Sequence, residues 1–481
     1  MLKFDNENIL ISNIKKLNYK DLVIFLIPFC IFMYYLHVFN PGILSYDSFN
    51  QIHQITTNDF YNWHPFFHTF IEMLCFKVYA SPISVGIMQI SVFSIIWMAL
   101  CKYNRAEENQ KLFIVQCLIT LVISLIPING IFSITLMKDI LFSYLLLLFC
   151  FLIEVLWDND FDVSYAFVFI LALTMAFICQ LRPNGLILVF VSLIFLAILL
   201  FKKNSDKKLY IIIPALVIIF ILLISSLNMA YDVKDNQKDV FLDKTVHILA
   251  YYDLNGDISH EDHEKIYKLI SKEDIKDNFN IYFTDPTYKV SNKHAFKEHK
   301  MDYIKLAVKY SLKNPLDFIE YVLKSSSMVW NISKGDGEGW IVYRTDIETP
   351  REHFYKARNT QPVSDLDNAS AKNLGTSSYY NLNSYASMFR DTPILDTLFN
   401  NPAFYMYMAF VVLAILYYIT KSYGVFLIYL PNFLSALIVM LSTPIQSYRY
   451  LYGNLLVFYL LLIILARYLL TKDKSSNTGI Q

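Results

Sequence analysis

Long apolar stretches separated by polar segments dominate this chain of 481 residues. A transmembrane helix needs about 20 consecutive, mostly apolar residues, and ten stretches approach that length. They are 21–39, 83–101, 112–129, 139–157, 163–181, 185–201, 209–227, 402–420, 424–442 and 450–470. The pattern therefore predicts an all-α polytopic membrane protein with about ten transmembrane helices.

A shorter apolar run, 66–80, differs from these ten because it contains Glu72 and Lys77. A run of about 14 residues favours an interfacial or re-entrant helix over a spanning one. We therefore expect this run to lie at one membrane surface.

Lysine and arginine are distributed unequally between the two sets of connecting segments. If 66–80 does not span, the cations of the short loops and of the two tails fall mainly on one side of the membrane, which the positive-inside rule identifies as the cytoplasm. Both termini are then cytoplasmic, and the loop 158–162, which carries no cation, is cytoplasmic as well. The cations on that side are Lys3, Lys15, Lys16, Lys20, Lys102, Arg105, Lys111, Lys202, Lys203, Lys207, Lys208, Lys421, Arg467, Lys472 and Lys474.

This topology divides the chain into three parts. Residues 1–227 form an N-terminal membrane module with a first external loop at 40–82, and 401–481 form a C-terminal membrane module with a cytoplasmic tail. Between them, 228–400 is an extracytoplasmic soluble domain inserted before the last three spans. Its helix signals are Ser259 followed by Asp262, a capping pattern, and Asn314-Pro315, which starts a helix. The glycine-rich segment 335–339 reads as a loop.

Composition narrows the classes of function. The chain is 55% hydrophobic and 17% charged, with a net charge of zero, so nothing favours a nucleic-acid partner. All six cysteines lie in or beside apolar runs, a distribution that does not predict a disulfide framework in the polar segment.

The first external loop holds a dense set of polar side chains. Asp47 could take a proton from an attacking hydroxyl as a general base, or it could simply cap an interfacial helix. Gln51 and His64 follow it as candidate substrate-binding residues, although His64 could instead anchor the 66–80 run. Together with His53 and His68, His64 could also ligate a metal, but their spacing matches no compact metal motif.

Three further external turns carry isolated charges at the same membrane depth as Asp47. They contain the candidate binding residues Lys138 and Asp139, Arg182 and Asn184, and Tyr448 and Arg449. Ionisable groups at a membrane boundary often face a cavity or a charged partner, and an arginine can bind a phosphate through two parallel hydrogen bonds. The alternative is that these cations only anchor helix ends at the lipid headgroups.

These motifs resemble the GT-C superfamily of integral-membrane glycosyltransferases, and more closely a bacterial group of GT-C-like proteins. The resemblance rests on Ser45-Tyr-Asp-Ser-Phe-Asn-Gln51, His64-Pro65, Met137-Lys-Asp139, Arg182-Pro-Asn-Gly185 and Tyr448-Arg-Tyr450, and covers mainly the membrane part. It implies an inverting transfer of a sugar from a polyprenyl-phosphate-linked donor to a cell-envelope glycan or lipid acceptor outside the cell. Asp47 would be the general base. Family members often carry paired acids in this loop, whereas Asp47 has no acidic neighbour, so a divalent metal cofactor is not firmly implied.

Two other functions remain open from the sequence. One is a polysaccharide polymerase or ligase, which would share the lipid-linked donor and the compartment. The other is a transporter or flippase of lipid-linked glycans, a class that favours repeated halves and broken helices. The chain shows no internal repeat and contains only 12 glycines.

Overall fold

The computed structural model describes residues 17–105, 109–203, 208–235, 239–333, 340–442 and 447–471. Over these ranges the regular structure is helical, and β pairing is limited to four isolated bridges. Three groups of predictions lie outside the described residues. They are the loop 335–339, the N-terminal Lys3, Lys15 and Lys16, and the later Lys207, Lys472 and Lys474.

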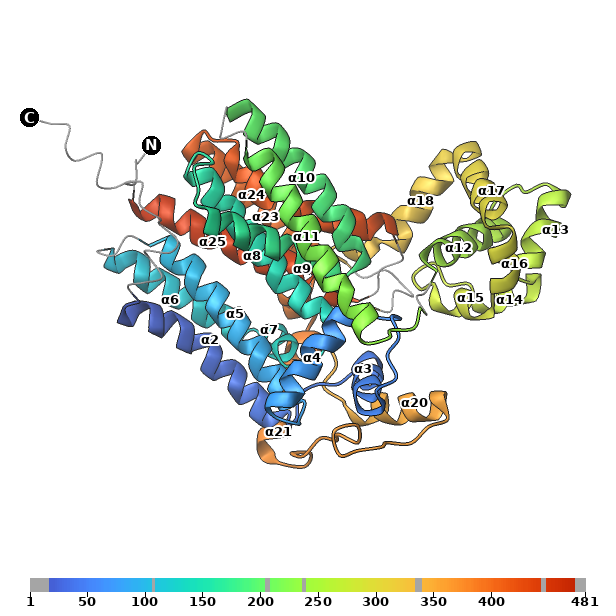
Figure 1. The fold of residues 1–481 in the computed structure, drawn as a ribbon, viewed down its shortest axis with the longest axis horizontal. Helices are drawn as coiled ribbons and strands as arrows, with labels where there is room; N and C mark the ends of the chain where they lie inside the picture. Colours follow the sequence, from blue (N-terminus) through green and yellow to red (C-terminus); the bar gives the residue numbers. More distant parts are fainter. Residues whose placement is uncertain are drawn as a thin grey trace, which may run out of the picture.

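Eight of the described helices are long and apolar enough to cross a membrane. This confirms a polytopic membrane architecture, with helices side by side in one bundle (Figure 1). They are α2 (Tyr19–Val38), α5 (Ile83–Tyr103), α8 (Lys138–Asp158), α10 (Pro183–Lys203), α11 (Leu209–Ala230), α23 (Pro402–Thr420), α24 (Gly424–Ser442) and α25 (Tyr452–Thr471), the last extended by the 3₁₀ turn η1 (Tyr448–Leu451).

The run 112–129 is not one straight helix. It forms α6 (Gln110–Leu125) and α7 (Pro127–Ser133), which meet at an angle of 73°. Proline has no backbone N–H and clashes with a preceding helical turn, so Pro127 ends α6 and begins α7. The Asn129 side chain donates to the Ile123 carbonyl at 2.7 Å, and Gln89 donates to the carbonyls of Ser133 and Thr135. These side chains satisfy backbone groups that the break leaves free inside the bundle.

The fifth predicted span is shorter than expected. Residues 163–181 form α9 (Tyr165–Leu181), an apolar helix of 17 residues. With α6 and α7 counted as one broken span, up to nine helices could cross the membrane by length and composition. The number ten therefore stays a prediction.

Two short helices follow α2 and form the first loop. They are α3 (Tyr46–Thr57) and α4 (Phe66–Val78). With 13 residues, α4 is too short to span a bilayer, in agreement with an interfacial or re-entrant helix.

The polar segment between α11 and α23 is mostly helical and includes a separate small core. Helices α12 to α18 surround that core, which is built from residues such as Leu249, Ile266 and Tyr321. The predicted starts are confirmed: Ser259 caps α13, and Pro315 is the first residue of α18. The segment comprises α12 (Val240–Asn255), α13 (His260–Leu269), α14 (Lys272–Asn278), α15 (Asp285–Val290), α16 (Lys293–Glu298), α17 (Lys300–Lys313), α18 (Pro315–Ser325), α19 (Ser327–Trp330), α20 (Glu348–Arg358), α21 (Ser377–Asp391) and α22 (Pro393–Phe399).

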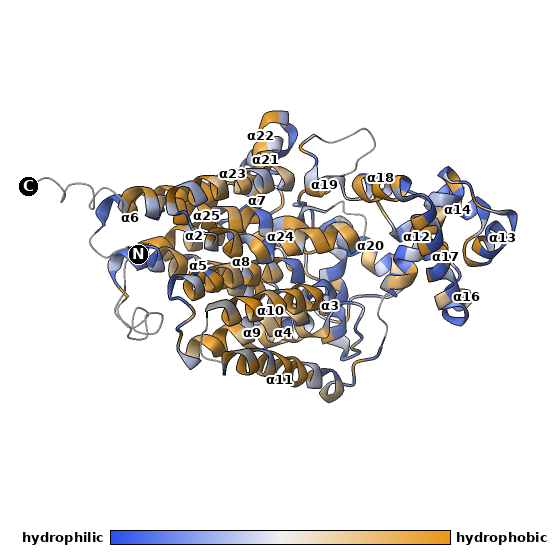
Figure 2. Ribbon diagram, turned by 90° about the horizontal axis from the view of Figure 1, so that it is seen from above, coloured by the Kyte–Doolittle hydropathy of each residue, from blue (hydrophilic) through white to orange (hydrophobic). Residues whose placement is uncertain are grey.

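The bundle has two chemically different ends. Helix α2 begins and α25 finishes at one end, which we call proximal, whereas α12 to α18 lie beyond the other, distal end (Figure 1). The bundle helices are largely hydrophobic and α12 to α18 are mixed in character (Figure 2). Ion pairs join helices at the proximal end: Asp21 with Lys102 and Arg105, and Arg467 with Asp158.

Candidate functional site

A short backbone pairing at the distal end brings the first loop against the start of α8. The Ile43 N–H donates to the Ile134 carbonyl at 2.9 Å, and the Leu136 N–H donates to the Ile43 carbonyl at 3.0 Å. The Ser48 hydroxyl adds a bond to the Leu136 carbonyl at 2.6 Å. Asp47 follows one of the two paired segments and Lys138 follows the other. The pairing therefore holds the two charges near each other.

Six side chains from five segments then form a continuous polar network. Lys138 Nζ lies 2.8 Å from His64 Nδ1, and His64 Nε2 lies 3.4 Å from Asp47 Oδ1. Asp47 Oδ2 accepts from Arg449 Nη1 at 3.2 Å. Arg449 Nε lies 3.6 Å from Asp139 Oδ2, whose other oxygen lies 3.2 Å from Arg182 Nε. All six residues were singled out from the sequence, and the structure brings them together.

The network controls the protonation of its two members outside the spanning helices. Burial alone would raise the pKa of the Asp47 carboxyl, but His64, Arg449 and Lys138 outweigh it and hold that pKa well below its usual value. Burial, together with the charge of Lys138, lowers the pKa of His64. A lysine ammonium can only donate, so the neutral imidazole accepts at Nδ1 and carries its proton on Nε2, toward Asp47.

The two arginines of the network are also held by aromatic rings. Arg449 donates to the Tyr450 hydroxyl at 3.0 Å and lies 4.9 Å from the centre of that ring. Arg182 lies 4.8 Å from the same ring and 5.0 Å from the ring of Phe142. Stacked guanidinium groups of this kind are restrained in position while their N–H groups stay available for an anion.

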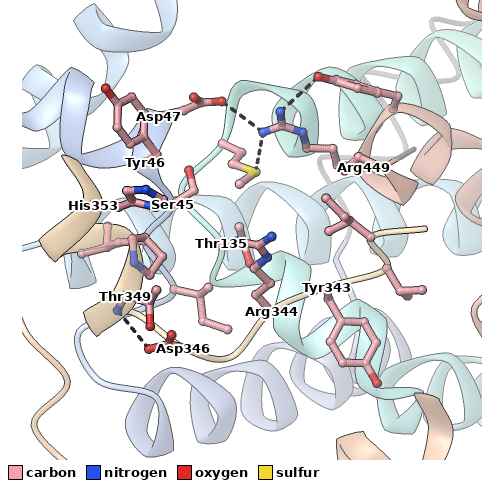
Figure 3. A pocket seen from close by; sticks show the side chains of 18 of the residues that line it. Ser45, Tyr46, Asp47, Thr135, Tyr343, Arg344, Asp346, Thr349, His353 and Arg449 are labelled. Atoms are coloured by element: carbon pink, nitrogen blue, oxygen red, sulfur yellow. Dashed lines mark hydrogen bonds and ion pairs between the residues drawn. The ribbon is translucent and has the colours of Figure 1, made fainter. Parts of the chain in front are cut away.

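Asp47 and Arg449 face a cavity of about 460 Å³ at the distal end (Figure 3). This volume lies within the usual range for small-molecule sites. One wall comes from the bundle and includes Thr135, Met137 and Tyr450. The other comes from the polar segment, where residues 341–353 carry Arg344 and His353 into the lining and Asp243 and residues 283–285 complete it.

Two contacts hold the second wall in place. The Tyr448 N–H donates to the Ile341 carbonyl at 2.9 Å, which pairs the start of the wall with the segment that carries Arg449. Farther along, the fully buried carboxylate of Asp367 lies 2.9 Å from His53 Nδ1 on α3 and accepts from the Val363 N–H at 3.0 Å and from the Tyr355 hydroxyl. These contacts join the loop after α20 to the first-loop helix beneath it.

Three predicted binding residues lie outside this network. Gln51 is buried behind it, donating to Thr69 at 2.9 Å and accepting from His68 at 3.2 Å. Asn184 donates to Ser442 at 3.2 Å and so joins α10 to α24. Tyr448 has a fully buried ring that packs against Phe132, and the tyrosine that contacts Arg449 is its neighbour Tyr450.

The second wall was not found from the sequence. Arg344 and His353 lie about 300 residues from Asp47 along the chain, in a segment without a recognisable motif. Arg344 and His353 give no distinct sequence signal, because other basic residues such as Arg351 and Arg358 stand close to them. Their relation to Asp47 depends on long-range contacts that periodicity does not reveal.

The three first-loop histidines have different partners and do not converge. His53 contacts Asp367, His64 contacts Lys138, and His68 contacts Gln51. Within the described ranges, no group of three or more His, Cys, Asp or Glu side chains is arranged to hold a metal ion.

Searches against protein-family models, curated proteins and solved structures find no match to this chain. The chemistry of the site is therefore inferred from its own geometry. That geometry offers an ionised carboxylate beside a guanidinium in a partly buried cavity: one group that accepts a proton and one that stabilises negative charge on an oxygen.

Proposed function

We propose that this chain is a membrane glycosyltransferase that uses a polyprenyl-phosphate-linked sugar and transfers it to a cell-envelope glycan or lipid acceptor. The observation that carries the proposal is the pairing of Asp47 with Arg449 at the cavity, 3.2 Å apart and surrounded by Lys138, Asp139 and Arg182. A proton acceptor and an oxyanion stabiliser are the two groups that such a transfer needs.

The chemistry is a single displacement. The acceptor hydroxyl attacks the anomeric carbon, a new C–O bond forms, and its proton passes to Asp47. The bond between that carbon and the phosphate oxygen breaks with its electrons on the oxygen, and Arg449 stabilises the resulting charge. Attack from the face opposite the leaving group inverts the anomeric configuration.

The Asp47–Arg449 pair also explains why Asp47 would become a stronger base only when the donor is bound. In the free protein, Arg449 contributes to the low pKa of Asp47, which makes Asp47 a weak base. A donor phosphate that draws the guanidinium to itself removes part of that stabilisation and raises the pKa of Asp47. The donor thereby increases the basicity of the carboxylate that the acceptor needs.

The membrane arrangement belongs to the same proposal. We place the distal end outside the cell, with a GT-C-like arrangement of about ten spans and both termini in the cytoplasm. A polyprenyl phosphate in the outer leaflet would then present its phosphate at the depth of Arg449, the first arginine of the last span. Nucleotide sugars are absent from that compartment, which favours a lipid-linked donor.

The test uses the purified full chain in lipid nanodiscs with labelled donors. We expect sugar transfer from polyprenyl monophosphate sugars to an envelope glycan fraction, and no transfer from the corresponding nucleotide sugars. Lipid-phosphate release without a glycosylated product, or no turnover with any polyprenyl-linked sugar across a panel, would contradict the proposal. ATP-independent movement of the intact lipid-linked glycan between leaflets would instead establish the transporter.

A further inference from the structure

The second wall of the cavity contains cationic and hydrogen-bonding groups that the proposed reaction does not use. Arg344 and His353 both line the cavity, and both side chains are exposed to it or to solvent. Figure 3 shows Arg344 projecting from its extended segment toward the middle of the pocket. Neither residue makes a hydrogen bond or ion pair with any residue in the described ranges.

The acidic side chains that line the cavity differ from Arg344 and His353, because they already have partners within the protein. Asp47 is paired with Arg449. Asp346 accepts from the N–H groups of Glu348 and Thr349 at 2.9 and 3.3 Å, which caps α20, and Asp243 accepts from the Thr284 hydroxyl at 3.2 Å. Asp285, the fourth acidic residue of the lining, also has a partner within the protein. The four carboxylates are thus engaged, whereas the guanidinium of Arg344 has no such partner in the described ranges.

Arg344 also differs from the arginines of the network. Arg449 and Arg182 each lie within 4 Å of a carboxylate, so their charges are partly neutralised before any ligand arrives. Arg344 stands three residues beyond Ile341, the wall residue paired with Tyr448. At roughly 3.3 Å per residue of extended chain, the Arg344 backbone lies up to about 10 Å along the wall from that contact.

We propose that Arg344, assisted by His353, forms a second anion subsite that binds a phosphate or carboxylate group of the acceptor. An unpaired guanidinium in a cavity offers several N–H donors in a planar fork that suits such groups. This subsite rests on the proposed function and extends it: the acceptor is an anionic glycan or polyol phosphate and not a neutral lipid. Its anionic group lies on the polar-segment side, while the donor phosphate is at Arg449.

The experiment measures ligand binding and needs no turnover. Purified full-length protein in nanodiscs is titrated calorimetrically with four probes: a glycerol phosphate trimer, a galacturonate trimer, the neutral sugar maltotriose and polyprenyl monophosphate. The variants are Arg344→Ala, Arg344→Lys and, as a matched control on the same segment, Arg351→Ala. Arg351 pairs with Glu348 at 2.7 Å and does not line the cavity.

We expect the wild type to bind at least one anionic trimer and to bind it better than maltotriose. Arg344→Ala should weaken that binding roughly tenfold or more, because charge-assisted hydrogen bonds are lost. Arg344→Lys should retain part of it, Arg351→Ala should retain all of it, and polyprenyl monophosphate should bind every variant alike.

Two results would overturn the subsite. Equal binding of the anionic trimers to wild type and Arg344→Ala would show that Arg344 takes no anion. A loss confined to polyprenyl monophosphate would assign Arg344 to the donor instead of the acceptor. Failure of the proposed reaction is a separate result, because it appears as absent turnover while trimer binding still depends on Arg344.

Discussion

At the scale of single residues, the site is an alternation of charges in which no member acts alone. Three cations, Lys138, Arg182 and Arg449, face two carboxylates, Asp47 and Asp139, with a neutral His64 between Lys138 and Asp47. Buried charges of this kind are expensive to desolvate unless they are paired. The excess of one cation leaves the network suited to one more negative group, as a donor phosphate would supply.

Asp47→Asn is expected to keep the fold and to lower the turnover number by about 10²–10⁴-fold, the usual contribution of a general base. The amide retains the shape of the side chain but cannot accept the proton. Transfer rates from a polyprenyl-phosphate-linked sugar measure the effect. Asp59→Asn is the matched control, because Asp59 is largely exposed and pairs with the exposed Lys234. Near wild-type turnover in the Asp47 variant would remove the base assignment.

Substitution of Arg449 should produce a graded loss of donor affinity. Arg449→Lys keeps a point charge but not the planar fork, so it should lose part of the binding. Arg449→Ala should weaken binding by roughly tenfold or more, since a charge-assisted hydrogen bond contributes about 1.5–3 kcal/mol. Titration with polyprenyl monophosphate tests this, with Arg390→Ala as control because Arg390 pairs locally with Asp391 and Ser387. Unchanged affinity in both Arg449 variants would leave Arg449 as an interfacial anchor.

The network also predicts a pH dependence. Lys138 helps to lower the pKa of Asp47 and of His64, so Lys138→Gln should raise both. Activity needs ionised Asp47 and falls as the pH drops through its pKa, so the acidic limb of kcat/KM should move to higher pH. The control is Lys234→Gln, which alters an exposed pair. An acidic limb that stays in place, or moves to lower pH, would show that Lys138 does not act on the base.

At the scale of helices, apolar length predicted most of the fold and failed where local chemistry intervened. Every predicted run is helical, but Pro127 breaks the third and the fifth is two residues shorter than predicted. The charges at the distal turns were predicted because ionisable residues stand out against apolar neighbours. The wall with Arg344 and His353 was not, because polar residues in a polar segment carry no such contrast. Tyr448 and Tyr450 could not be distinguished, because sequence does not show which ring faces Phe132.

The α20 wall depends on one buried carboxylate, that of Asp367. Asp367→Ala removes the carboxylate that contacts His53 Nδ1 and accepts from the Val363 N–H, whereas the Tyr355 hydroxyl keeps the backbone carbonyl of residue 367 as an acceptor. A buried polar group left without its partner costs about 1–3 kcal/mol. We expect faster amide hydrogen exchange across 348–369 with little change in α8 or α25. The exposed neighbour Asp365 supplies the control variant Asp365→Ala. Unchanged exchange over α20 would show that the wall is held by its apolar contacts alone.

At the scale of the whole molecule, the charged residues at the two ends of the bundle are arranged differently. Ion pairs at the proximal end, such as that of Arg467 with Asp158 at 2.7 Å, join spanning helices to one another. At the distal end the charges converge on a cavity that the polar segment closes from one side. A polar segment inserted between α11 and α23 thus supplies half of a site whose other half is fixed in the membrane helices.

The orientation of the helix bundle in the membrane can be tested by cysteine labelling. The loop between α8 and α9 has no cation, so the positive-inside rule gives the least support for its side of the membrane. It is assigned to the cytoplasm because of the number of spans that precede it. In a chain whose six native cysteines are replaced, Asp162→Cys reports on that loop and Val290→Cys on the polar segment; both positions are exposed. A membrane-impermeant maleimide added to intact cells should label position 290, and should label position 162 only after permeabilisation. Transfer activity of both variants provides the control for correct folding. Labelling of 162 but not 290 in intact cells would place the cavity in the cytoplasm, where nucleotide sugars are present, and would remove the reason for a lipid-linked donor.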